Sequence, residues 1–188
     1  HLRSWRDGWR HLRFLLLFTP RWLFLYPGVA LTALALLQLV YAQLHMPGQT
    51  WWPVGIHTQL FAAGGMVLGF QTMLFAMGAV LVRHHAGLDA PHSRDRWARR
   101  VATGRLLGIG GSALAAVGLA LCVGLTVQWT STGFGPLDPE VAMRRIIPGV
   151  AMLLIGTQAI LASIFFAAVR SAFDWHQAPR RSNSSRHA

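Results

Sequence analysis

Residues 106–128, LLGIGGSALAAVGLALCVGLTVQ, decide the fold, because no charged side chain interrupts them over a length that can cross a bilayer. Three further stretches have the same character: Trp22–Gln43, Thr58–Val82 and Ile146–Val169. An α-helix rises about 1.5 Å per residue, so about 20 apolar residues span a hydrocarbon core of about 30 Å. The sequence therefore predicts an all-α integral membrane protein with four transmembrane helices.

The composition favours the same class of protein. Hydrophobic residues make up 53% of the chain and charged residues only 12%, which is unusual for a soluble domain of 188 residues. The net charge of +11 would also suit a nucleic-acid partner. However, the basic residues flank the apolar stretches and do not form one patch. We therefore expect them to contact anionic membrane lipids, and we expect no nucleic acid.

The distribution of arginine predicts the orientation in the membrane. All seventeen basic residues are arginines, and fifteen of them lie before the first stretch, between the second and third, or after the fourth. Only Arg144 and Arg145 lie in the other two loops. Because arginine-rich loops stay on the cytoplasmic side, we expect both termini to be cytoplasmic. The fifteen are Arg3, Arg6, Arg10, Arg13, Arg21, Arg83, Arg94, Arg96, Arg99, Arg100, Arg105, Arg170, Arg180, Arg181 and Arg186.

Residues 1–20 form a juxtamembrane segment of different character. Apolar residues recur there at helical spacing beside a stripe of arginines, which is typical of an amphipathic helix lying in the membrane interface. Pro20 ends this helix before the first span. Two roles stay open: a plain membrane anchor, or a surface that binds the phosphate of a lipid. The apolar residues are Leu2, Trp5, Trp9, Leu12 and Leu16, and the candidate phosphate-binding residues are Arg3, Arg6, Arg10 and Arg13.

Small residues predict how the spans pack. In the third span they occupy every fourth position, which allows another helix backbone to approach closely. The second span contributes two glycines at the same spacing, so we expect the second and third spans to touch along these faces. The residues concerned are Gly65 and Gly69 in the second span, and Gly104, Gly108, Ser112, Ala116, Ala120 and Gly124 in the third.

The remaining segments are assigned as follows. Residues 21–177 form the four-helix transmembrane domain. The last helix is expected to begin near Pro139, with Asp138 as its N-cap and proline at the first helical position. Residues 178–188 are rich in arginine and serine, which predicts a disordered cytoplasmic tail.

The spans offer little catalytic chemistry. No carboxylate, lysine or histidine lies near the centre of a span, which disfavours an ion-coupled transporter or pump. No phosphate-binding loop, activated nucleophile or Asp-x-Asp motif is present, and no two histidines occupy facing mid-membrane positions. We therefore expect no catalytic residue, metal or haem in this chain. We expect the polar residues within the spans to form hydrogen bonds between helices. Gln71 and Gln158 are the two that merit a test as substrate ligands.

Several motifs suggest a family. The run SWRDGWRHLRFL at Ser4–Leu15, followed by PRWLF at Pro20–Phe24 and by Tyr26-Pro27-Gly28, resembles bacterial family 2 glycosyltransferases. It is similar to the junction between their cytoplasmic catalytic domain and their membrane domain. The segments FGPLDP at Phe134–Pro139 and Ile147-Pro148-Gly149 also resemble this group, so the resemblance covers nearly the whole chain.

The resemblance implies a function that this chain does not carry alone. In this group, which is similar to dolichyl-phosphate mannose synthases, an N-terminal GT-A domain binds a nucleotide sugar and a divalent metal. It transfers the sugar to a membrane lipid, typically polyprenyl phosphate, at the inner leaflet. None of that domain's motifs occurs here, so the resemblance implies its detached membrane module in a bacterial inner membrane. Its partners would be membrane lipids, the polyprenyl-phosphate acceptor and its own catalytic domain.

The first residue, His1, is not a methionine and lies within a predicted helix, so we expect the chain to be a fragment that is inactive alone. An alternative from another class stays open. A stand-alone four-span protein, such as a lipid-linked-sugar translocase or an assembly subunit, would have the same hydropathy pattern.

Overall fold

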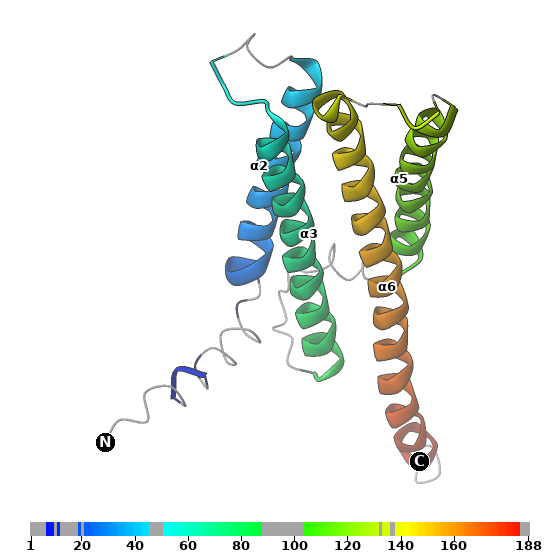
Figure 1. Cartoon of the computed structure of the whole chain (residues 1–188). Coiled ribbons are helices and arrows are strands. Elements are labelled where there is room, and N and C mark those ends of the chain that lie inside the picture. Colours follow the sequence, from blue (N-terminus) through cyan, green and yellow to red (C-terminus); the bar gives the residue numbers. More distant parts are fainter. Residues whose placement is uncertain are drawn as a thin grey trace.

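A computed structural model describes much of the chain, with gaps at both termini and in three loops. The described residues include four long helices and one short π-helical turn (Figure 1). Each long helix is long and apolar enough to cross a membrane, so the predicted all-α, four-span class is confirmed. The residues described are 7–9, 11, 19, 21–45, 51–87, 104–131, 133–135 and 138–184, with side chains to 173.

The elements follow one another as an up-and-down bundle. The π-helical turn η1, Arg21–Leu25, runs directly into α2, Tyr26–Leu44. Helices α3, Ile56–His85, α5, Arg105–Ser131, and α6, Pro139–Ser184, follow. We call the end where η1 begins the inner end and the opposite end the outer end, after the predicted orientation. Helices α3 and α6 therefore both run from the outer end to the inner end.

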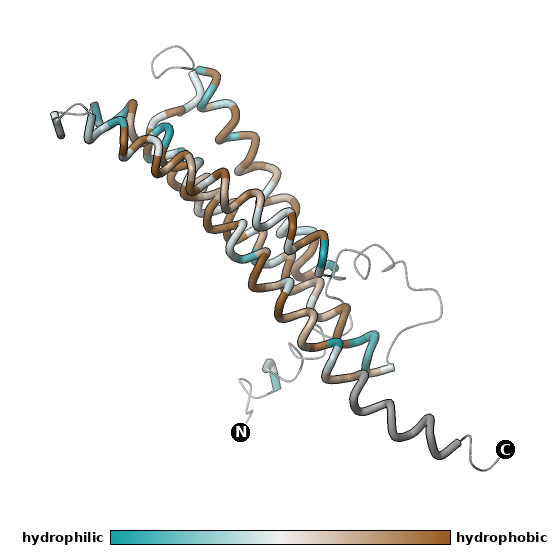
Figure 2. Tube along the Cα trace, turned by 90° about the vertical axis from the view of Figure 1, so that its right-hand side faces the viewer, coloured by the Kyte–Doolittle hydropathy of each residue, from teal (hydrophilic) through white to brown (hydrophobic). Residues whose placement is uncertain are grey.

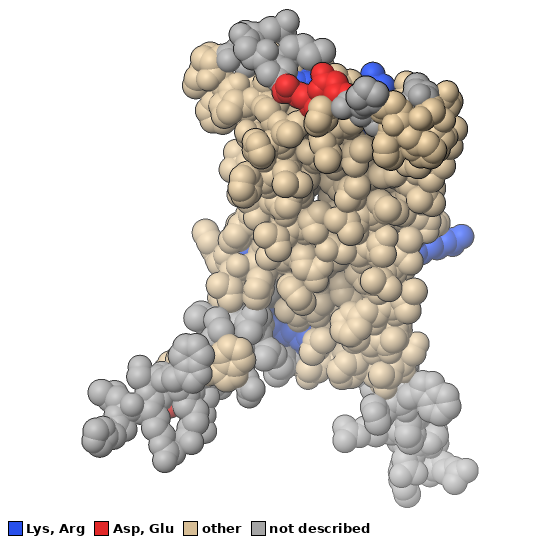
Figure 3. Space-filling model, in the orientation of Figure 1, with Lys and Arg blue, Asp and Glu red and all other residues tan. Residues whose placement is uncertain are grey.

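Hydrophobic residues recur along every long helix, as expected for helices surrounded by lipid (Figure 2). Large hydrophobic residues such as Leu37, Phe61 and Leu106 are 66%, 81% and 70% exposed. Figure 3 shows acidic and basic side chains together at the end where α6 begins, beside a broad uncharged surface. This surface would be unstable in water, and it matches a membrane environment.

The helices pack as two antiparallel pairs. Helix α2 lies against α3, and α5 lies against α6, while contacts between α3 and α6 join the pairs (Figure 1). Each pair meets at facing glycines. A β-carbon built on Gly28 would lie 2.8 Å from the carbonyl oxygen of Gly69, and one on Gly69 would lie 2.8 Å from that of Gly28. The spans therefore associate through close backbone approach.

The prediction that the second and third spans touch along their small residues is wrong, because these faces pack on α2 and α6 instead. Gly69 packs on α2. Gly65 also faces α2, because a β-carbon built on it would lie 3.5 Å from Cδ1 of Leu31. Gly104, which directly precedes α5, and Gly108 within α5 both approach Ser163 of α6. The other small residues predicted to form this face of the third span are exposed. A β-carbon on Gly124 would meet nothing within 4 Å. The exposed residues are Ser112, Ala116, Ala120 and Gly124.

Helix geometry explains the correction. At about 100° per residue, each step of four residues rotates the row by about 40° around the helix, so a strict four-residue row leaves the contact after two steps. The face that follows α6 alternates steps of three and four residues instead. It consists of Gly104, Gly108, Gly111, Ala115, Gly118 and Cys122.

The start of α6 is as predicted. The carboxylate oxygen Oδ1 of Asp138 accepts a hydrogen bond of 2.9 Å from the backbone N–H of Glu140, and Pro139 is the first helical residue. Asp138 is therefore the N-cap. The helix extends further at its other end than we expected. It continues to Ser184, so residues 178–184 of the predicted disordered tail are helical.

Polar side chains hold the outer end together. Pro148 lies inside α6 and has no N–H, so the carbonyl oxygen of Arg144 lacks its usual helical partner. The amide of Gln43 on α2 donates to that oxygen at 2.8 Å and to Oε1 of Gln59 on α3 at 3.2 Å. Gln59 is fully buried and donates to the carbonyl oxygen of Val54 at 3.1 Å. This network ties α2, α3 and α6 at one level.

Arg144 adds a buried cation to the same end. Its side chain is 7% exposed, and Nη2 donates to the carbonyl oxygens of Ala42 and, at 2.7 Å, His45. These carbonyls belong to the C-terminal end of α2, where the helix dipole favours a positive charge. Arg144 therefore caps α2 from α6.

Candidate functional site

Arg3, Arg6, Arg10 and Arg13 lie outside the described residues, and so does most of the predicted amphipathic helix over residues 1–20. Asp7–Trp9 and His11 are helical and exposed. The lipid-phosphate surface therefore stays a prediction.

Basic side chains mark the inner end among the described residues. Arg83 lies in the last turn of α3 with His84 and His85, where the helix dipole favours positive charge. The ring of His85 lies 5.3 Å from that of Phe173 on α6, which ties the inner ends of α3 and α6 together. Arg170 of α6 is also half-buried at this end. The inner end thus presents guanidinium groups from two neighbouring helices.

A groove of about 580 Å³ runs between α3 and α6 in the inner half of the bundle. Leu74 and Phe166 are buried and form its floor, whereas Phe75 and Phe165 are 56% and 57% exposed and form its rim. The groove therefore opens sideways, toward the hydrocarbon of the bilayer. Its lining is Gln71, Leu74, Phe75, Gly78, Ala79, Val82, Gln158, Leu161, Ala162, Phe165 and Phe166.

Two glutamines line one region of this groove. Gln71 comes from α3 and Gln158 from α6, and they are the polar residues of the lining. Among the described residues, the buried oxygen Oε1 of Gln158 has no hydrogen-bond partner. A buried carbonyl oxygen without a donor is costly, so such a group commonly marks a place for water or a ligand. The structure brings together the two residues that the sequence singled out.

Gly78 packs against this floor. A β-carbon at Gly78 would lie 3.4 Å from Cε1 of Phe166, an ordinary van der Waals separation, so the phenylalanine ring lies directly against α3 at this position. Leu74, Met77 and Leu81 pack around the same ring as a buried cluster. Sequence reasoning missed the groove, because its lining depends on which face of α3 meets α6 and no motif records that pairing.

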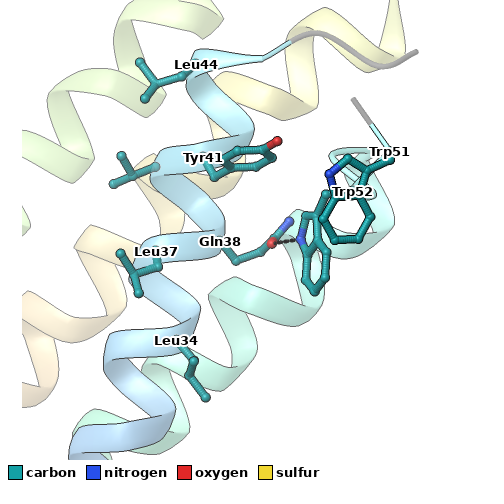
Figure 4. Close-up of a pocket in the computed structure, with 8 residues that line it drawn as sticks. Leu34, Leu37, Gln38, Tyr41, Leu44, Trp51 and Trp52 are labelled. Carbon is teal, nitrogen blue, oxygen red and sulfur yellow. Dashed lines mark hydrogen bonds between the residues drawn. The ribbon is translucent and has the colours of Figure 1, made fainter. Parts of the chain in front are cut away.

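A second cavity, of about 480 Å³, lies on α2 near the outer end (Figure 4). Here Gln38 Oε1 accepts a bond of 2.6 Å from the indole N–H of Trp52, and Gln38 Nε2 donates to the carbonyl oxygen of Pro53 at 2.9 Å. Gln38 therefore forms hydrogen bonds to the loop between α2 and α3, not to a neighbouring helix. Trp51 is 89% exposed, which is typical of an aromatic residue at a membrane interface.

Metal ligands do not gather in the part of the chain that the structure describes. No three side chains of histidine, cysteine, aspartate or glutamate come together there. His84 and His85 are neighbours in sequence, with ring centroids 5.5 Å apart.

Comparison with known proteins supports a family. Residues 78–170 match the C-terminal transmembrane region of glycosyltransferase family 2. This range holds the end of α3, all of α5 and most of the membrane part of α6, and it includes most of the groove lining. No solved structure matches the chain.

A curated relative agrees with that match. The chain is 33% identical over 174 residues to the low-salt glycan biosynthesis hexosyltransferase Agl6 of Haloferax volcanii, an archaeon. The alignment covers 90% of this chain and 40% of the relative, so the chain spans less than half of the relative's length. Both matches therefore point to the same likeness: residues 78–170 are similar to the C-terminal transmembrane region of glycosyltransferase family 2, and most of the chain is similar to part of a hexosyltransferase.

Proposed function

We propose that this chain is the membrane domain of a sugar transferase that moves a sugar from a nucleotide sugar to polyprenyl phosphate. The observation that carries the proposal is the match of residues 78–170 to the family 2 transmembrane region. The relative's name, a hexosyltransferase, supports the same reaction class. The catalytic residues and the divalent metal would belong to a separate GT-A domain, and the membrane domain would present the acceptor lipid to it.

The arginine distribution supports the placement of this reaction. With fifteen of seventeen arginines at the inner end or in the adjoining segments, both termini would be cytoplasmic, in a bacterial inner membrane or its archaeal counterpart. Guanidinium groups pair well with phosphate oxygens, and near an anionic surface each is worth about 1 kcal/mol. The inner leaflet is therefore where this protein would hold a lipid phosphate.

Holding the acceptor is a chemical contribution in itself. A lipid phosphate that diffuses freely must meet the activated sugar in the right orientation. Fixing it on a bundle joined to the catalytic domain converts that encounter into a reaction within one complex, which can contribute several kcal/mol. Residues 1–20 would lie between the two parts, at the depth of lipid headgroups.

A transfer assay on the full-length protein tests the proposal. Membranes containing the protein would be incubated with labelled nucleotide sugars, a divalent cation and polyprenyl phosphate. We expect label in a lipid that extracts into organic solvent and releases its sugar under mild acid. Movement of a preformed lipid-linked sugar across a vesicle membrane, without any sugar transfer, would favour the stand-alone translocase instead.

A further inference from the structure

The groove between α3 and α6 opens toward the bilayer in the inner half of the bundle. We propose that it binds the apolar chain of the acceptor lipid, with the lipid phosphate at the arginines of the inner end. This inference rests on the proposed function, because it assigns a binding site to the acceptor of that reaction.

The shape of the groove fits a chain. Its volume of about 580 Å³ lies within the usual range for a ligand site, and its floor of Leu74 and Phe166 is buried. The rim residues Phe75, Leu161 and Phe165 are between 56% and 61% exposed, so a chain could enter from the bilayer without leaving hydrocarbon. An apolar chain in the groove would contact aromatic and aliphatic side chains on both walls.

Charge fixes the direction of the chain. Along α3 the lining runs from Gln71 to Val82, which is roughly 17 Å of helix, and Arg83 follows Val82 directly. On α6, Arg170 follows Phe166 by one helical turn, and its Nη2 would lie 3.2 Å from a β-carbon on Gly104, so its guanidinium lies beside the start of α5 at the same end of the bundle. An apolar groove with cations at one end complements an amphiphile that has an anionic head and an apolar tail. A neutral lipid would gain nothing from this end.

The glutamines define the other end of the site. A chain that passed Gln158 would bury its unpaired Oε1 further against hydrocarbon, and hydrocarbon offers no donor. The favourable part of the groove therefore runs from the glutamines to the inner end. It would bind only the isoprene units nearest the phosphate, and the rest of a long chain would lie in the bilayer.

Acceptors of different length test the inference in the full-length protein. Ala79 lines the groove and Ala168 is exposed on α6 at a similar depth, outside it. We expect Ala79→Phe to raise the KM for long-chain polyprenyl phosphate about tenfold, with kcat unchanged. A water-soluble phosphate acceptor without a prenyl chain should keep its KM, and Ala168→Phe should alter neither acceptor.

A crosslinking experiment covers the case in which Ala79→Phe does not fold. A photoreactive phenylalanine analogue would replace Phe75 on the groove rim or, as control, Phe61, which is 81% exposed on the outer half of α3. Labelled polyprenyl phosphate should crosslink at position 75 and not at position 61, in the presence of excess phospholipid. Equal crosslinking at both positions, or none at 75, overturns the inference.

The outcomes also separate the inference from the proposed function. If the unmodified protein transfers sugar to neither acceptor, the proposed function fails and the inference fails with it. If transfer occurs but Ala79→Phe leaves the KM for the long acceptor unchanged, or raises it equally for both acceptors, only the groove assignment is wrong.

Discussion

Gly111 of α5 and Gly156 of α6 face each other so closely that neither position has room for a side chain. A β-carbon on Gly111 would lie 2.8 Å from the carbonyl oxygen of Gly156, and one on Gly156 would lie 2.6 Å from that of Gly111. Two turns further along α5, a β-carbon on Gly118 would lie 2.6 Å from the carbonyl oxygen of Gly149. Van der Waals contact between backbones therefore holds this pair of spans together.

The glycine contact predicts which substitutions separate α5 from α6. Gly118→Leu must push the helices apart, because its β-carbon alone would lie 2.5 Å from the backbone nitrogen of Leu153. We expect a loss of about 1–3 kcal/mol, seen as a lower melting temperature in detergent. Ala116→Leu, on the exposed face, is the matched control and should change little. Greater sensitivity at position 116 would contradict the packing described here.

A second prediction concerns the buried guanidinium of Arg144. Arg144→Gln removes a charged donor from the carbonyl oxygens at the end of α2, so we expect stability to fall by about 1.5–3 kcal/mol. Arg145→Gln changes the same charge at an exposed position and should alter stability by less than about 0.5 kcal/mol. Thermal denaturation of each variant in detergent measures the loss of stability relative to the unmodified protein. Equal effects would mean that Arg144 does not cap α2.

Topology gives a third prediction. Reporter fusions at Pro53 and Gly133 should read as external, and fusions at Ala90 and after Ala188 as internal, because the arginines concentrate on one side. At each site we would fuse one reporter that is active only outside the membrane and one that is active only inside. Their relative activities give the side on which that site lies. An internal reading at Pro53 would overturn the orientation on which the inner and outer ends are named.

The N-terminal arginines give a fourth prediction. In the full-length protein, changing Arg6 and Arg10 together to glutamine should reduce transfer to polyprenyl phosphate by tenfold or more, because each lost charge-assisted contact costs about 1.5–3 kcal/mol. Hydrolysis of the nucleotide sugar needs no lipid and should persist. The same change at Arg180 and Arg181 keeps the net charge equal and serves as control. Equal transfer rates in the two double variants would leave only the anchoring role.

Some features of the structure could be predicted from local sequence. Span number follows from runs of uncharged residues, and the Asp138 cap follows from a polar side chain directly before proline. These properties depend on residues within one element. The helical conformation of residues 178–184 was not predicted, because their arginine- and serine-rich composition favours solvent exposure without excluding a continued helix.

Contacts between helices were harder to predict. Every span is apolar on all sides, so hydropathy does not reveal which face meets a neighbour. Glycines narrow the choice, but a four-residue row drifts around the helix and indicated Ala116 where the contact uses Ala115 and Gly118. The meeting of Gln71 and Gln158 in one groove depends on the α3–α6 register, which no single-helix pattern contains.

In the proposed function, these spans hold the acceptor lipid of a sugar transferase. The most direct test is to irradiate the full-length protein with a polyprenyl phosphate that carries a photoreactive group in its first isoprene units, and to map the labelled peptides. The account predicts label in α3 and α6 beside the groove, competed by unlabelled polyprenyl phosphate and not by uncharged polyprenol of equal length. Label found only outside residues 1–188, or competed equally by polyprenol, would contradict it.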